Sequence, residues 1–211
     1  MLYLANMAIH SYALTDVNSV KTYLGISGST DDSLIEMLIN QMTDWTENYC
    51  GGRRFKDTTY TNEIYESRFA KESSDFPQLA RSKEYWVSLV NYPITATTPV
   101  SVSMRSGNTD YTVLDSTNYD VYEKRGQIYL YGGIPWIRKA LKITYSAGYA
   151  TIPTDLSMAC IQLVCKLYEK RKSQGKKAES IGGASITWAD PMNEMDGYTK
   201  GTLENYKRKY V

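Results

Sequence analysis

Hydrophobic positions repeat at helical spacing in two long stretches of the chain. The first runs from Asp31 to Tyr49 and places on one face Leu34, Ile35, Leu38, Ile39, Met42, Trp45 and Tyr49. The second follows Pro153, ends near Gly175 and carries the stripe Leu156, Ala159, Cys160, Leu163, Val164, Leu167 and Tyr168. Such stripes must be shielded from water, so we expect the two helices to pack against each other in one core.

Two shorter helices are expected nearer the ends of the chain. Thr15-Asp16 is a suitable N-cap for a helix that reaches Leu24, and Gly25 is a suitable C-cap. Thr202 to Tyr210 forms a final helix with one apolar side, made of Leu203, Tyr206 and Tyr210. A helix this short seldom persists alone in water, so it needs a docking surface.

The pattern between Phe55 and Tyr149 is typical of strands, with short runs of Val, Ile, Tyr and Thr between turn residues. We expect strands at Thr58 to Tyr65, Tyr85 to Val90, Val100 to Met104, Tyr111 to Leu114, Tyr119 to Tyr122, Gln127 to Tyr131 and Leu141 to Tyr145. Turn residues stand at Ser106-Gly107-Asn108, Arg125-Gly126 and Gly132-Gly133. Ser67 to Lys83 is polar and predicts a long loop, and Ala184 to Trp188 predicts one more short strand.

These elements predict an α+β fold, in which an antiparallel helical core receives an inserted antiparallel β-sheet or small sandwich and ends in an extended C-terminal segment. The organisation we expect is an N-terminal segment, residues 1–14; a first part of the helical core, residues 15–55; an inserted β region, residues 56–149; a second part of the helical core, residues 150–175; and a C-terminal segment with a short strand and a docking helix, residues 176–211.

Composition excludes several classes of protein. At 211 residues, with 42% hydrophobic and 22% charged residues, the chain is long enough for one substantial core. Its net charge of +1 gives no general attraction to nucleic acid or lipid. Three cysteines and one histidine argue against a disulfide framework or a zinc site, so we expect no metal and no cofactor. The apolar segment Met1 to Leu14 is shorter than the about 20 residues of a membrane-spanning helix, and we expect no membrane association.

Catalytic motifs are missing from the sequence. It contains no phosphate-binding loop, dinucleotide fingerprint, metalloprotease helix or nucleophile elbow. His10 stands in an apolar segment without an orienting motif. The carboxylate pairs Asp31-Asp32 and Glu63-Glu66 fit helix caps and surface charge. We therefore expect no catalytic residues and no enzyme.

One basic run and the tyrosine content are the remaining signals. The run consists of Lys166, Lys170, Arg171, Lys172, Lys176 and Lys177. It could contact a DNA backbone or an acidic partner surface, or it could be a solvated helix end. The 19 tyrosines favour an interface, because tyrosine combines a large rigid ring with a hydrogen-bonding tip, although strand propensity explains some of them.

Several segments together carry a family resemblance. They are Val20 to Ile26, Asp31 to Ile35 and Gly51 to Phe55 in the first part of the chain, Asn91 to Ile94, Val100 to Val102 and Arg125 to Leu130 in the middle, and Ile143 to Tyr149, Ile152 to Leu156 and Leu167 to Arg171 in the last part. In their order and spacing these segments resemble the head-tail connector (adaptor) family of tailed bacteriophages, in its long form with an inserted β-sheet.

The resemblance implies a function based on assembly. A connector of this kind is synthesised in the host cytoplasm and forms a ring of twelve copies in the neck of the virion, between the portal protein and a tail or stopper (tail-completion) protein. Genomic DNA would pass through the lumen without sequence-specific binding. The resemblance further implies that Leu203, Tyr206 and Tyr210 dock on the portal. We therefore predict that deletion of Thr202 to Val211 would spare the fold and abolish docking.

Two other functions stay open at this point. The first is a nucleic-acid-binding module that uses the basic run between Lys166 and Lys177 together with strand tyrosines as a stacking surface. The second is an enzyme with a carboxylate-only site, such as a hydrolase of glycosidase type, which would need two carboxylates that converge in a cleft.

Overall fold

The chain forms two compact units. A computed structural model describes residues 8–66, 84–106, 110–132, 134, 138–171, 178–181, 184–187 and 195–208. The helical unit combines Met1–Gly52 with Thr151–Arg208, and the β unit is formed by Arg53–Ala150. The β unit is therefore an insertion between the two halves of the helical unit in the sequence.

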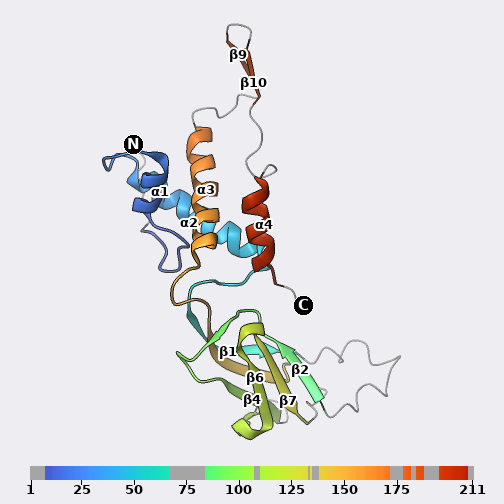
Figure 1. Ribbon diagram of the computed structural model, residues 1–211. Coiled ribbons are helices and arrows are strands. Elements are labelled where there is room, and N and C mark those ends of the chain that lie inside the picture. Colours follow the sequence, from blue (N-terminus) through green and yellow to red (C-terminus); the bar gives the residue numbers. More distant parts are fainter. Residues whose placement is uncertain are drawn as a thin grey trace. The chain divides into compact units, whose positions relative to one another are not determined.

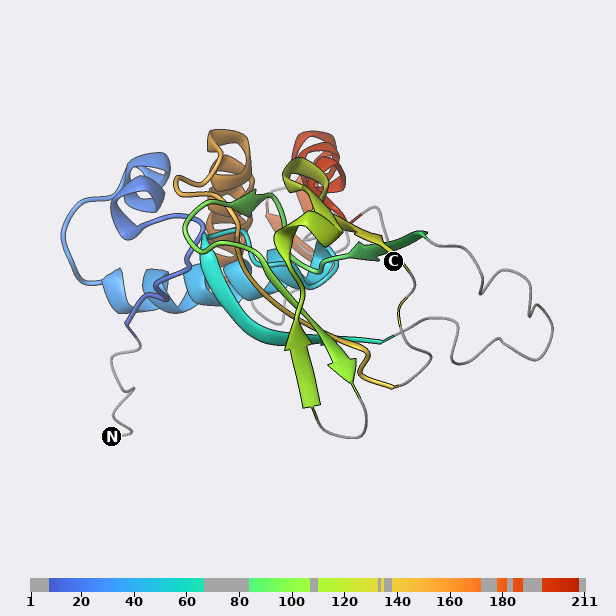
Figure 2. The same cartoon turned by 90° about the horizontal axis from the view of Figure 1, so that it is seen from below.

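The helical unit contains four helices: α1 (Val17–Leu24), α2 (Asp32–Tyr49), α3 (Thr154–Lys170) and α4 (Gly197–Tyr206). Helix α3 packs against each of the other three. Figure 1 shows α3 and α4 side by side, and Figure 2 shows α2 running across them. The expected pairing of the two long amphipathic helices is confirmed, because α2 and α3 pack on each other.

The core of the helical unit is built from the predicted apolar stripes. Its buried residues include Ile35, Leu38, Ile39 and Met42 of α2 and Leu156, Ala159, Cys160, Leu163 and Val164 of α3. Cys160 and Cys165 are both buried free thiols, and burial raises the pKa of each to about 12. These two cysteines therefore serve as small apolar residues of the core, as the stripe predicted for Cys160.

Capping residues determine where the short helices begin. The Asp16 side chain accepts a hydrogen bond from the Ser19 backbone N–H at 3.0 Å, and Gly25 ends α1 with a φ of 65°. At α4 the cap is Asp196, which accepts from the Thr199 N–H at 2.7 Å. The helix expected at Thr202 to Tyr210 was therefore placed wrongly, because the structure ends α4 at Tyr206 and begins it at Gly197, where an unrecognised cap satisfies the first N–H groups.

The β unit contains two antiparallel sheets. The first has the strand order β1-β8-β4-β5, with β3 also paired to β8, and the second has the order β2-β7-β6. The strands are β1 (Thr58–Tyr65), β2 (Glu84–Ser88), β3 (Ile94–Thr95), β4 (Ser101–Ser106), β5 (Asp110–Val113), β6 (Tyr119–Tyr122), β7 (Gln127–Tyr131) and β8 (Leu141–Ala147). Short 3-10 turns, η3 (Ser116–Asn118) and η4 (Glu123–Arg125), flank β6.

The two sheets enclose one apolar core. Val87 of β2 and Ile128 and Leu130 of β7 belong to the same buried cluster as Val102 of β4 and Leu141, Ile143 and Tyr145 of β8. The inserted region is thus a small sandwich, and the α+β class is confirmed. The two-residue strand β3 was not expected, because it is too short to show an alternating pattern.

A third, two-stranded sheet lies in the C-terminal part of the chain. Strand β9 (Ala178–Ile181) pairs with β10 (Ala184–Thr187), which overlaps the strand expected at Ala184 to Trp188. Several predictions fall outside the described residues: the loop Ser67 to Lys83, the turn at Gly107-Asn108, Lys172, Lys176, Lys177 and Tyr210.

Helix α4 depends on its apolar residue Leu203, which is fully buried. Replacement of Leu203 by Ala should lower the free energy of unfolding by about 2–5 kcal/mol, because it leaves a cavity against α3. Urea unfolding followed by far-UV circular dichroism measures this change. The matched control is Tyr198→Ala on the same helix, where the side chain is exposed and the effect should stay within about 0.5 kcal/mol. Equal stabilities of the two variants would contradict the packing.

Candidate functional site

Four of the segments that carry the family resemblance meet in the β unit. Arg53, Arg54 and Phe55 lie against Asn91 and Tyr92, and the turn at Gly126 and the chain at Gly148 close around the same segments. We call this group the motif cluster; it comprises residues 53–57, 91–93, 126 and 148–150. Positions that are scattered along the sequence thus form one site, at the residues where the chain enters and leaves the β unit.

A buried arginine lies at the centre of the motif cluster. Arg53 is 2% exposed, and its guanidinium lies 3.6 Å from the ring centroid of Tyr92 and 4.9 Å from that of Phe55. The guanidinium also donates a hydrogen bond to the Tyr92 backbone carbonyl. The next backbone N–H, of Arg54, donates to the Asn91 side-chain carbonyl at 2.7 Å. Stacking between rings stabilises a cation most where water is excluded, so Arg53 joins the two segments firmly.

Glycine is required where the chain leaves the β unit. The Gly148 N–H donates to the Pro93 carbonyl at 2.9 Å, and a Cβ on this glycine would lie 2.6 Å from the Lys56 carbonyl carbon. Its φ of 126° is also one that side chains rarely allow. Next to it, the Tyr149 N–H donates to the Phe55 carbonyl at 2.7 Å. The entering and leaving segments are therefore in direct backbone contact.

A second polar cluster lies within the sandwich and was not anticipated from the sequence. The Glu63 carboxylate accepts hydrogen bonds from the hydroxyls of Tyr65 and of Tyr145, the latter at 2.6 Å. Tyr145 is fully buried and its ring stacks on that of Tyr60, with 5.2 Å between centroids. A bulge in β1 between Tyr60 and Glu63, with Asn62 at a φ of 56°, turns all these side chains to one face.

Burial changes the acidity of both tyrosines in this cluster. The pKa values of Tyr65 and Tyr145 lie well above the ordinary tyrosine value, mainly because burial removes these hydroxyls from water. Their hydrogen bonds to Glu63 raise the pKa values further. Both hydroxyls therefore remain protonated donors at neutral pH. Within the β unit these two hydroxyls supply hydrogen bonds to the Glu63 carboxylate. The side chains of Glu63, Tyr65 and Tyr145 are thus bonded to one another, and none of the three is a free acid or base for catalysis.

Ion pairs tie together the helix ends of the helical unit. Asp31, the residue before α2, accepts hydrogen bonds from the Tyr168 hydroxyl and from Arg171 at 3.1 Å. The Arg171 guanidinium also lies 3.7 Å from the Tyr168 ring centroid. Lys21 of α1 pairs with Asp32 at 2.8 Å. The carboxylate pair Asp31-Asp32 thus joins three helices.

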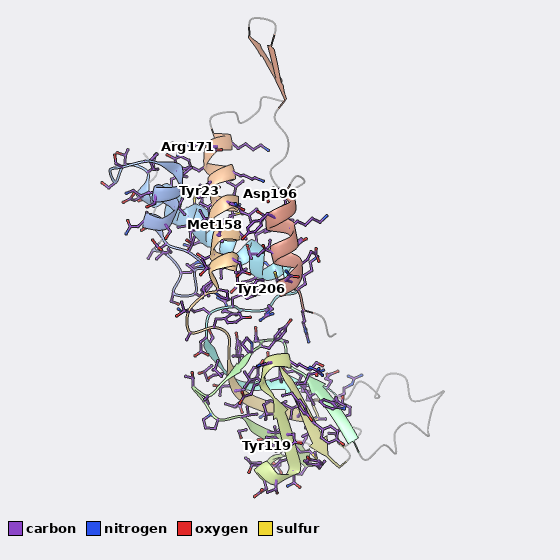
Figure 3. The ribbon with its side chains drawn as sticks, viewed as in Figure 1. Tyr23, Tyr119, Met158, Arg171, Asp196 and Tyr206 are labelled. Atoms are coloured by element: carbon purple, nitrogen blue, oxygen red, sulfur yellow. The ribbon has the colours of Figure 1, made fainter. Side chains whose placement is uncertain are left out.

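The predicted basic run is partly engaged within the helical unit. Lys166 pairs with Asp196, the cap of α4, at 3.2 Å, and Arg171 pairs with Asp31. Lys170 lies in the last turn of α3. Figure 3 shows Arg171 near one end of α3 and Asp196 at the start of α4. Lys172, Lys176 and Lys177 lie outside the described residues, so the run as a whole remains a prediction.

Two of the three predicted docking residues hold α4 in place, and the third, Tyr210, lies outside the described residues. Leu203 is fully buried, and the Tyr206 hydroxyl donates to Asp155 at 2.7 Å. Glu204, between them, accepts from the Tyr49 hydroxyl at 2.7 Å. Deletion of Thr202 to Val211, which the sequence predicted to spare the fold, would remove half of α4 and a core residue, so the structure instead predicts that the deletion destabilises the helical unit.

Described residues of the β unit line two hollows that a ligand could enter. One, of about 410 Å³, is lined by Val121 to Arg125. The other, of about 320 Å³, includes Val121, Glu123 and residues of the β3–β4 connection. Among their described lining residues Glu123 is the carboxylate common to both. A hydrolase of glycosidase type needs two converging carboxylates, which these linings do not supply.

The described part of the chain shows neither a metal site nor a membrane-spanning helix. No group of three or more His, Cys, Asp or Glu side chains there could hold a metal ion. None of the helices within the described ranges combines the length and the apolar character of a membrane span.

Taken together, the clusters define a class of protein: an α+β protein in which polar side chains join helices and strand ends. The family model for head completion proteins matches residues 13–209, and the chain belongs to this family. A search of curated proteins found no match. Among solved structures, a chain from the virion of a native gene transfer agent particle is similar, with a TM-score of 0.53 and 12% identity over 100% of this chain and 97% of that one.

The family confirms the resemblance noted in the sequence. The protein is a phage head-tail connector-type protein, a structural component of a virion that assembles with other structural proteins of the particle. The gene transfer agent chain supports the same fold across the whole length.

The close approach at Gly148 generates a stability prediction. Gly148→Ala should lower the free energy of unfolding of the β unit by about 3 kcal/mol or more, because the new Cβ adds a backbone clash to the strain of a positive φ. Gly132→Ala is the matched control, since Gly132 has a φ of 103° but nothing within 4 Å of the added Cβ. This control substitution should lower the free energy of unfolding by about 1–2 kcal/mol through backbone strain alone. Urea unfolding of both variants measures the difference, and equal losses would rule out the clash.

The buried tyrosines generate a prediction about alkaline pH. In the unfolded chain a tyrosine has a pKa of about 10. The pKa values of Tyr65 and Tyr145 are raised in the folded protein, so these side chains keep their protons to higher pH. The unfolded state therefore binds fewer protons above that pH, and stability should fall by up to about 1.4 kcal/mol per pH unit for each tyrosine. Tyr65→Phe should reduce this slope in urea titrations above about pH 10. An unchanged slope would show that Tyr65 ionises normally.

Proposed function

We propose that this protein is the subunit of a head-tail connector (adaptor) ring in the neck of a tailed-phage particle, between the portal protein and a tail or stopper protein. The observation that carries the proposal is the match to the head completion protein family over residues 13–209. The convergence of four of the resemblance segments in the motif cluster supports it, because it gives those four a shared physical role in the fold. Twelve copies is the ring number that the resemblance implies.

Portal docking is assigned in this proposal to the end of the chain. Leu203 and Tyr206 hold α4 on the rest of the helical unit, and Tyr210 follows the helix as the contact residue. In this arrangement Leu203 acts through the position of α4, because its buried side chain cannot itself reach a partner.

Genomic DNA would pass through the ring without sequence-specific binding. The charges of Lys166 and Arg171 are balanced by Asp196 and Asp31 within the helical unit, which favours a protein environment for this helix end over phosphate binding. A channel that bound DNA tightly would slow its passage, so a balanced charge suits the proposed role.

Electron microscopy tests the ring directly. The purified protein, alone and mixed with heads that carry a portal but lack this protein, is expected to form annular particles or to add a ring to the portal vertex. Monomers that add no density to the vertex would contradict the proposal. Tyr210→Ala should form rings that attach poorly, whereas Tyr198→Ala, an exposed tyrosine on α4, should attach like the wild type. Equal attachment of both variants would remove Tyr210 from the docking surface.

A further inference from the structure

The three-stranded sheet of the β unit exposes a continuous row of aromatic rings. Trp86 of β2, Tyr129 and Tyr131 of β7 and Tyr122 of β6 lie on its outward face. The Trp86 ring centroid lies 5.0 Å from that of Tyr122 and 4.9 Å from that of Tyr129, which in turn lies 5.1 Å from that of Tyr131. We call this surface the aromatic face.

The aromatic face is exposed and rigid. Trp86, Tyr122 and Tyr131 are 47%, 42% and 52% exposed. Asp120 of β6 lies among the rings and accepts a hydrogen bond from the Tyr131 hydroxyl at 2.5 Å. Large rings held by one another lose little conformational entropy on binding, and tryptophan and tyrosine are the residues that most often dominate protein interfaces. The aromatic face therefore has the composition of a binding surface, with the negative charge of Asp120 on its edge strand β6.

The other sheet of the sandwich has an outward face of different chemistry. The outward positions of β4, β5 and β8 carry the cations Arg105 and Lys142, the residues Tyr111 and Val113, and serines and threonines, but no carboxylate. Ile64 of β1 is the register partner of Lys142, and Lys142 lies 4.1 Å from the Tyr111 ring centroid. Val113 is 65% and Ile64 is 46% exposed. We call this surface the basic face.

The two faces lie on opposite sides of one sandwich, because the inward positions of both sheets share the buried core. They also differ in the sign of the charge they carry, Asp120 on one and Arg105 and Lys142 on the other, and each exposes large apolar side chains. A closed ring needs such a pair, since each subunit must present two different and complementary surfaces to its neighbours.

We propose that the aromatic face of one copy of this chain binds the basic face of the next copy in the ring. This inference rests on the proposed ring function and names the contact that builds it. Asp120 would face the cations Arg105 and Lys142 of the neighbour. The exposed Ile64 and Val113, which lie on the two edge strands on either side of these cations, would contact rings of the aromatic face. Charge complementarity favours a second copy of this chain as the binding partner, because the same β unit carries a negative charge on one face and positive charges on the other.

Two variants each remove one face. Trp86→Ala removes the central ring of the aromatic face, and the double variant R105E/K142E reverses the charge of the basic face. All three residues lie on outward positions, so both variants should keep the wild-type circular dichroism spectrum. Loss of a central aromatic anchor should weaken association about 30-fold per contact. Trp86→Tyr keeps a ring at this position and should assemble nearly as well as the wild type.

Mixing the two variants gives a result that only a head-to-tail contact produces. Sedimentation velocity should find each variant alone as a monomer, at concentrations where the wild-type protein forms rings. The equimolar mixture should contain a dimer and nothing larger, because one intact aromatic face and one intact basic face remain. The dimer joins the R105E/K142E copy, through its aromatic face, to the Trp86→Ala copy.

The remaining outcomes separate this inference from the ring itself. Normal rings from both variants would overturn the proposed contact and leave the ring function standing. Trp86→Ala rings that form normally but fail to attach to heads would overturn it and assign the aromatic face to another protein of the particle. Dimers of R105E/K142E alone would indicate that two aromatic faces pair with each other. A wild-type protein that stays monomeric and adds no ring to heads would overturn both proposals.

Discussion

The backbone contact between Gly148 and Lys56 is the constraint on which the β unit depends. It brings the segment that enters the unit against the segment that leaves it, with hydrogen bonds between Phe55, Asp57 and Tyr149 on either side. A unit whose two ends are held together in this way can be inserted into a helical core without separating the halves of that core in space. The entropic cost of closing a long insertion is then compensated by contacts within the β unit itself.

Buried polar groups determine the details around this constraint. Arg53 lies between aromatic rings and donates to the carbonyl of Tyr92, while Glu63 accepts from two tyrosines inside the sandwich. Each group would be costly to bury without such partners. Their partners come from distant parts of the sequence, so these contacts select one register of the strands.

The two units use their charged and aromatic residues differently. In the helical unit, Asp31, Asp196 and Glu204 bind partners on neighbouring helices. The β unit instead leaves a row of rings and a patch of cations on its outward faces. In the proposed connector the outward faces of the β unit serve contacts between copies, and the end of the chain beside α4 serves docking on the portal.

The sequence by itself determined the α+β class, the two long helices and most strands, because burial of one face imposes a period on the apolar residues. Strands β1, β6 and β7 begin and end where alternation predicts. The start of α4 was missed because its cap, Asp196, follows no local apolar pattern. Only the tertiary structure decided that the bulge at Asn62 turns Glu63 toward Tyr145, and that Trp86 faces outward. Alternation separates two faces of a strand, but which contact a buried group meets depends on residues far away in the sequence.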